Sequence, residues 1–128
     1  MASFLHSRGR SFRYAFVGWR YVLRTQRNAW IHAAASVAVA LVGVWLGLSR
    51  LEWAAIVIAV ALVWVTEFIN TALEAVVDLA SPQQHPLARG AKDVAAAAVL
   101  IASLCSVVIG LLILGPPLWA RIQSIWAP

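Results

Sequence analysis

Residues 53–78 read WAAIVIAVALVWVTEFINTALEAVVD, and this stretch decides the fold. Its first half is wholly apolar, whereas its second half contains several polar residues. These are Thr66, Glu67, Asn70, Thr71 and Glu74, with Asp78 directly after them. An apolar run of about 20 residues can cross the roughly 30 Å hydrocarbon core of a bilayer. We therefore predict a transmembrane helix over 53–77 with a polar second half.

Two further apolar stretches, 29–48 and 94–114, are also long enough to cross a membrane. A short turn at 49–52 separates the first two spans, so these two should run antiparallel. We expect a loop over 78–93, because prolines interrupt it, and a tail over 115–128 that begins with Gly115-Pro116-Pro117. The chain is 62% hydrophobic and 12% charged, whereas soluble domains carry about 25% charged residues. The pattern predicts one all-α membrane domain over 1–128.

The N-terminal stretch 3–27 mixes basic and aromatic residues and holds six of the ten Lys and Arg residues. Such an arm could bind nucleic acid or anionic lipid headgroups. Because it lies directly before a membrane span, lipid headgroups are the better partner, and no nucleic-acid partner is expected. A disordered basic tail is the alternative, but the aromatic residues favour a helix lying in the membrane interface.

The basic residues also indicate the orientation. The N-terminal arm and the 78–93 loop carry eight of them, whereas Arg50 and Arg121 lie on the opposite side. The positive-inside rule therefore places the N-terminus and the 78–93 loop in the cytoplasm. The polar half of the second span then lies at the cytoplasmic face, where nucleotide is available.

The polar residues of the second span share one face. Successive helical residues advance by about 100°, so the five polar positions from 67 to 78 fall on a stripe about 100° wide. An acid in hydrocarbon costs roughly 2.5 kcal/mol or more, so Glu67 and Glu74 require a cation, a base or water nearby. Two carboxylates and the Asn70 amide can hold Mg²⁺ through oxygen ligands. A buried carboxylate can also act as a general base.

Lys92 and Asp93 stand where the third span is expected to begin. A lysine there can reach phosphate oxygens, and a helix N-terminus favours anions. Acids, an amide and a lysine at one membrane face are the groups that phosphoryl transfer needs. Two alternatives remain: helix association through intramembrane hydrogen bonds, and proton or ion translocation. His32, alone in an apolar span, is interpreted as a packed residue, and so is Cys105.

Three motifs resemble the small bacterial diacylglycerol kinase and undecaprenol kinase family, over about residues 10–112. They are Glu67-x-x-Asn70-Thr71-x-x-Glu74-x-x-x-Asp78, His85-Pro86-x-Ala88-Arg89-x-x-Lys92-Asp93, and an upstream stretch around Tyr14 with Asn28-x-x-Ile31-His32. The upstream stretch resembles the prenol-kinase-like branch. The resemblance implies a homotrimer of three-span protomers, each with an amphipathic surface helix, in the bacterial inner membrane. It also implies an enzyme that moves the γ-phosphoryl group of MgATP to a membrane lipid alcohol, undecaprenol first and diacylglycerol second.

The resemblance also implies residue roles. Glu67 would be the general base, Glu74 would bind Mg²⁺, and Asn70 would orient the phosphates. The nucleotide side would comprise Lys92 and Asp93 at the phosphates, Tyr14 and His85 near the nucleotide, and Asp78 where the family has an acid near the ribose.

One position departs from the family pattern. Where the family commonly has a metal-binding glutamate before the first span, this chain has Gln26. Gln26 keeps a carbonyl oxygen but loses a charge, so we expect it to be a weak metal ligand. A non-catalytic membrane protein, either a transporter subunit or an inactive family member, is therefore the alternative function.

Overall fold

The computed structural model describes residues 2–83 and 85–126, with side chains described from residue 10 onward. Its elements are α1 (Ala2–Thr25), α2 (Arg27–Leu46), α3 (Arg50–Ala80) and α4 (Pro86–Trp126). No strand occurs within these ranges. The last three helices are long and apolar enough to cross a membrane. The prediction of an all-α protein with three membrane-spanning helices is therefore confirmed.

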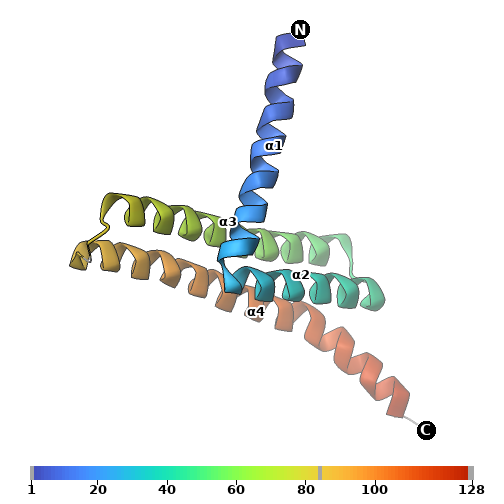
Figure 1. Cartoon of the computed structure of the whole chain (residues 1–128). Coiled ribbons are helices and arrows are strands. Elements are labelled where there is room, and N and C mark those ends of the chain that lie inside the picture. Colours follow the sequence, from blue (N-terminus) through green and yellow to red (C-terminus); the bar gives the residue numbers. More distant parts are fainter. Residues whose placement is uncertain (1, 84, 127–128) are drawn as a thin grey trace.

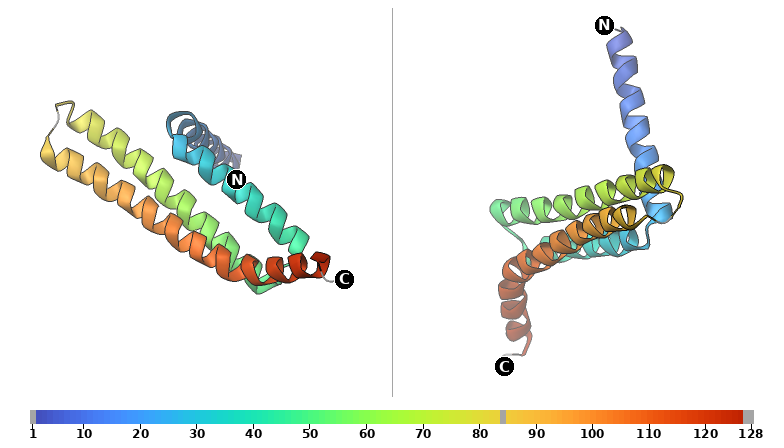
Figure 2. Two further views of the ribbon diagram at one scale, coloured as in Figure 1. Left: turned by 90° about the horizontal axis from the view of Figure 1, so that it is seen from below. Right: turned by 90° about the vertical axis from the view of Figure 1, so that its left-hand side faces the viewer.

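Helices α2, α3 and α4 lie side by side, and α3 and α4 make the most extensive contact (Figure 1). Helix α1 leaves this bundle and runs across the direction of the other three (Figures 1 and 2). The sequence predicted a helix in this region, and α1 is helical. A helix crossing the direction of the spans is suited to lie along a membrane surface, but that location stays a prediction.

The turn between α2 and α3 is built by local backbone bonding. Gly47 has a φ of 72°, a left-handed conformation that favours glycine. The amide N–H groups of Gly47 and Leu48 both donate to the carbonyl oxygen of Gly43, at 3.1 and 3.2 Å. Ser49 then begins α3 with a capping box, in which its hydroxyl and the Glu52 carboxylate each accept a backbone N–H. Glu52 is thus part of the helix start and not of the turn.

Two expected boundaries were wrong. The loop expected over 78–93 is shorter, because α3 continues to Ala80 and α4 already begins at Pro86. Proline suits the first helical position, where no N–H bond is required. Lys92 and Asp93 therefore lie well inside α4.

Helix α4 also continues through Pro116 and Pro117 to Trp126, where a tail was expected from 115. Prolines inside a helix remove hydrogen bonds and bend it without always ending it. Figure 1 shows the C-terminal part of α4, in orange to red, bending away from the bundle.

Few of the described residues are buried, and three of these buried residues are polar. Small or branched apolar residues such as Ala29, Ala59 and Ala102 are buried, while many large apolar side chains are exposed. Cys105 is exposed too, which corrects its interpretation as a packed residue. An apolar exterior with a partly polar interior fits a chain surrounded by lipid.

Candidate active site

The polar stripe of α3 faces the interior of the bundle. Glu67 is the largest fully buried side chain in the described part of the chain, at 1% exposure, and Asn70 and Thr71 are 7% and 4% exposed. Glu74 is half-buried and Asp78 is exposed. The stripe thus runs from the buried centre of the bundle out to the end that α3 shares with the start of α4.

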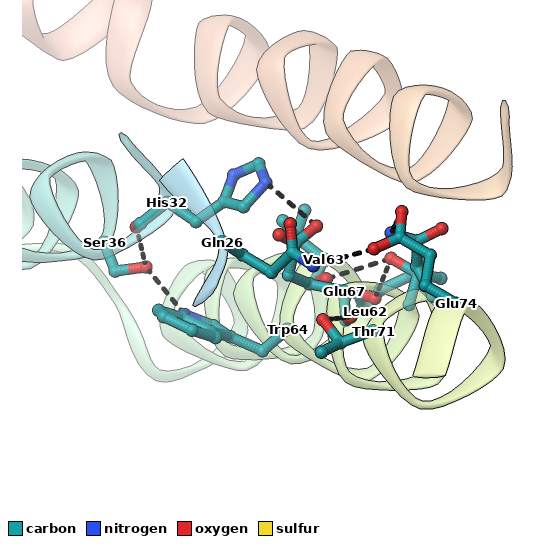
Figure 3. A network of polar contacts seen from close by, with 11 residues as sticks. Gln26, His32, Ser36, Leu62, Val63, Trp64, Glu67, Thr71 and Glu74 are labelled. Carbon is teal, nitrogen blue, oxygen red and sulfur yellow. Dashed lines mark hydrogen bonds and ion pairs between the residues drawn. The ribbon is translucent and has the colours of Figure 1, made fainter. Parts of the chain in front are cut away.

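Gln26 joins the α1–α2 break to this stripe. It is the residue before α2, with an extended backbone, and its side chain does not cap that helix. Its Nε2 instead donates a 2.8 Å hydrogen bond to Oε2 of Glu74. Asn70 Nδ2 donates to the other carboxylate oxygen of Glu74 at 3.1 Å. Glu74 therefore lies between two amides, from two different parts of the chain (Figure 3).

His32 on α2 faces the second acid. Its Nε2 lies 3.8 Å from Oε2 of Glu67, and the two side chains are 15% and 2% exposed. That separation is too long for a hydrogen bond. The backbone near His32 is fixed by a short relay, in which the Ser36 hydroxyl donates to the His32 carbonyl at 2.7 Å and accepts from the Trp64 indole N–H at 3.2 Å (Figure 3).

A cavity of about 290 Å³ lies among these groups. Residues from the start of α2, from the stripe of α3 and from the middle of α4 line it. They are Gln26, Asn28, Ile31, His32, Glu67, Asn70, Glu74, Ala96, Val99, Leu100 and Ser103. We call this space the acid cavity. It brings together Glu67, Asn70, Glu74 and Gln26 from the residues singled out in the sequence.

A second cavity, of about 520 Å³, lies where α3 ends and α4 begins. Its charged or titratable lining residues are Asp78, His85, Arg89 and Lys92. Lys92 Nζ is paired with Oδ1 of Asp78 across the two helices. We call this space the basic cavity, because it gathers two permanent cations and a histidine around one acid.

Two expected site residues lie apart from both cavities. Asp93 belongs to neither lining, and its side chain, 74% exposed, lies 4.0 Å from Arg89. Tyr14 is 68% exposed on α1 and also lines neither cavity. A single chain therefore places neither of these two residues in the lining of either cavity.

The donor set can accept a divalent metal only with help from a ligand. The described residues hold no group of three or more His, Cys, Asp or Glu side chains placed to bind a metal. However, Asn70 Oδ1 is buried and has no hydrogen-bond partner among them. Mg²⁺ is commonly held by one or two carboxylates together with substrate phosphates. Glu74 and this free amide oxygen fit such a site.

Sequence reasoning missed two residues of the acid cavity. His32 was set aside as a packed residue, although its polar position on α2 was visible. Ser103 on α4 was not singled out, because one serine in an apolar span is usually satisfied by its own helix. Ser103 Oγ is buried yet bonds to nothing within the described ranges.

Comparison with known proteins identifies similar sequences along most of the chain. The profile of a family described as prokaryotic diacylglycerol kinase matches residues 13–114. The chain is 46% identical over 109 residues to a diacylglycerol kinase of Synechocystis, covering 84% of this chain and 62% of that protein. It is 43% identical over 109 residues to an undecaprenol kinase of Bacillus subtilis, covering 85% and 89%.

A diacylglycerol kinase of Escherichia coli is 38% identical over 95 residues, covering 69% of this chain and 78% of that protein. The chain thus spans less than two thirds of the Synechocystis relative and most of the other two.

Proposed function

Because the chain belongs to the prokaryotic diacylglycerol kinase family, we propose that it is an ATP-dependent lipid kinase with undecaprenol as its acceptor. Diacylglycerol is the second candidate acceptor. The single observation that carries the proposal is the burial of Glu67 beside a cavity that also contains Glu74 and Asn70. A buried acid with no cation paired to it at hydrogen-bond distance is suited to take a proton from a substrate.

In the proposed reaction, the acceptor alcohol donates its proton to the Glu67 carboxylate as its oxygen attacks the γ-phosphorus of ATP. The new phosphorus–oxygen bond forms, the bond from the γ-phosphorus to the bridging oxygen breaks, and ADP leaves with the released electron pair. The products are a lipid phosphate, ADP and a proton held first on Glu67. The enclosed position of Glu67 excludes water, which would otherwise compete with the alcohol.

The phosphates of the nucleotide are assigned to the basic cavity, because its residues Asp78 and Lys92 lie one helical turn from Glu74 and Ala96 of the acid cavity. Lys92 and Arg89 supply positive charge there, and the imidazole of His85 lies directly before the start of α4. Lys92 is held by Asp78 in the free chain, so ATP must compete with that carboxylate. Asp93 would hold Arg89 in place, and Tyr14 would reach the nucleotide only from α1 of a suitably placed protomer.

Mg²⁺ would be held by Glu74 and the amide oxygen of Asn70, with Gln26 as a weak third ligand. When bound, the ion would neutralise charge on the phosphates during transfer. Both oxygens of Glu74 now accept amide N–H groups, so Gln26 would have to turn its amide to present oxygen. This cost makes the site weaker than one with a second carboxylate.

The remaining proposals concern the assembly. We place the chain in a bacterial inner membrane with a cytoplasmic N-terminus, α1 on anionic headgroups, and three protomers in one complex. A trimer would cover exposed apolar faces of the bundle and could bring Tyr14 of α1 to a neighbouring basic cavity.

The direct test is phosphate transfer by the purified full chain in detergent. We expect label from [γ-³²P]ATP to enter undecaprenol or diacylglycerol in the presence of Mg²⁺. A folded protein that labels neither lipid would overturn the kinase proposal and favour the non-catalytic alternative, which the neutral Gln26 motivates. Side-by-side assays with both lipids at equal mole fraction would identify the preferred acceptor.

A further inference from the structure

Two unpartnered polar atoms lie at the junction of the acid cavity with a larger apolar cavity. The apolar cavity has a volume of about 540 Å³ and runs between α2, α3 and α4. Only three residues line both spaces: Ile31, His32 and Ser103. Within the described ranges, His32 Nε2 and Ser103 Oγ are buried without a hydrogen-bond partner. The two polar groups at this junction are therefore unsatisfied in the free chain.

Leaving buried polar groups unpaired is destabilising, so such groups point to a ligand that would pair them. Here the ligand must be polar where it meets the acid cavity and apolar where it continues into the other cavity. A long-chain alcohol has this arrangement, with a polar hydroxyl at one end and an apolar chain behind it. On the basis of the proposed kinase function, we propose that His32 and Ser103 bind the hydroxyl of the acceptor lipid, whose first carbons occupy the apolar cavity.

The distance from His32 to Glu67 suits this role. The two atoms are 3.8 Å apart, too far to bond each other, but an alcohol oxygen about 2.8 Å from each fits beside the pair. The alcohol then donates its proton to Glu67 and accepts from His32 Nε2–H. Its second lone pair accepts from the Ser103 hydroxyl, which can rotate away when that lone pair attacks phosphorus.

This arrangement gives the two residues different kinetic effects. The Ser103 bond exists in the bound ground state and is released during attack, so its loss weakens binding without slowing the chemical step. The His32 bond persists while the oxygen becomes negatively charged, so its loss slows the chemical step. Neither residue lines the basic cavity, so the KM for ATP should stay unchanged.

The test uses the full chain in detergent with farnesol as a prenol that has one primary hydroxyl. For Ser103→Ala we expect the KM for farnesol to rise about 3- to 10-fold, with kcat not reduced. For His32→Ala we expect kcat to fall about tenfold or more, and for His32→Gln, which retains an N–H donor, a smaller loss. The matched control is Ser124→Ala, because Ser124 lines none of these cavities and its hydroxyl already donates to the Arg121 carbonyl at 2.8 Å.

Equilibrium binding of tritiated farnesol, measured without ATP, separates this inference from the kinase proposal. Weaker farnesol binding in Ser103→Ala and unchanged binding in Ser124→Ala would support the hydroxyl site even if no lipid were ever phosphorylated. Unchanged KM and binding in both the Ser103 and His32 variants, in a wild type that does transfer phosphate, would overturn it. Crosslinking of the apolar cavity to a second copy of the chain, with farnesol unable to compete, would overturn it as well.

Discussion

Gln26 and Glu74 are 48 positions apart in the sequence, and a 2.8 Å hydrogen bond joins Nε2 of the first to Oε2 of the second. The bond ties the break between α1 and α2 to the half-buried part of the polar stripe. It also means that the amide at position 26 acts as a donor in the free chain, whereas a metal ligand must present oxygen. Position 26 is therefore the weak point of the proposed metal site.

Replacing Gln26 with glutamate should strengthen metal binding. A second carboxylate beside Glu74 adds negative charge. It also presents an oxygen to the metal in either orientation, whereas the Gln26 amide must first turn. We therefore expect the Mg²⁺ concentration for half-maximal transfer to fall by about tenfold. A Mg²⁺ titration of initial rates measures this. Gln123→Glu adds the same charge near the end of α4, and an equal shift in that control would mean that position 26 does not act at the metal.

Replacing Glu67 with glutamine should remove the proposed base while preserving its size. We expect the rate of transfer to fall by about 100-fold or more, while the affinity for ATP, measured by equilibrium binding, stays within twofold. Glu52→Gln is the control, because Glu52 only caps the start of α3. Near-normal turnover in Glu67→Gln would show that another group accepts the proton.

Replacing Lys92 with glutamine should weaken nucleotide binding. Losing a charged hydrogen bond to phosphate is worth about 1.5–3 kcal/mol, which corresponds to a KM for ATP raised by about 10- to 100-fold. The KM for the lipid should not change. The control is Arg121→Gln, which removes the same charge outside the basic cavity. Arg121 lies instead beside Trp45, with its Cζ 6.0 Å from the ring centroid. A lipid KM that rises with the ATP KM would argue against a role confined to phosphate.

Replacing Gly43 with alanine should destabilise the fold. A Cβ there would lie 3.0 Å from side-chain atoms of both Leu48 and Trp53. Such overpacking costs about 1–3 kcal/mol, and alanine's helix preference offsets at most about 1 kcal/mol of that cost. Thermal loss of helical circular dichroism in detergent measures the effect. Gly90→Ala is the control, because its Cβ meets nothing within 4 Å and alanine favours helix. Equal melting temperatures for the two variants would show that the α2–α3 turn tolerates the extra atom.

The sequence predicted the helices because apolar run length is a strong signal, and it predicted the stripe because helical spacing places positions 67 to 78 on one face. It misplaced the loop and the end of α4, since Pro86 and Pro116 were interpreted as breaks when one begins a helix and the other bends it. The pairing of Lys92 with Asp78 depends on how α3 and α4 pack against each other. The spacing of residues within one helix does not reveal that packing. His32 and Ser103 were missed for the same reason: each is unremarkable in its own helix, and only their shared cavity makes them candidates.

The burial of Glu67 has an evolutionary consequence. Replacing a buried ion pair with well-packed apolar side chains is often neutral or stabilising, and an acid in hydrocarbon is costly, so we expect a leucine at position 67 to leave the fold intact while removing the proposed base. The largest fully buried side chain among the described residues is thus one whose loss folding alone would not penalise. On the proposed function, only a continuing demand for lipid phosphorylation would keep an acid there, and descendants freed from that demand should lose Glu67 early while keeping the same three-span architecture.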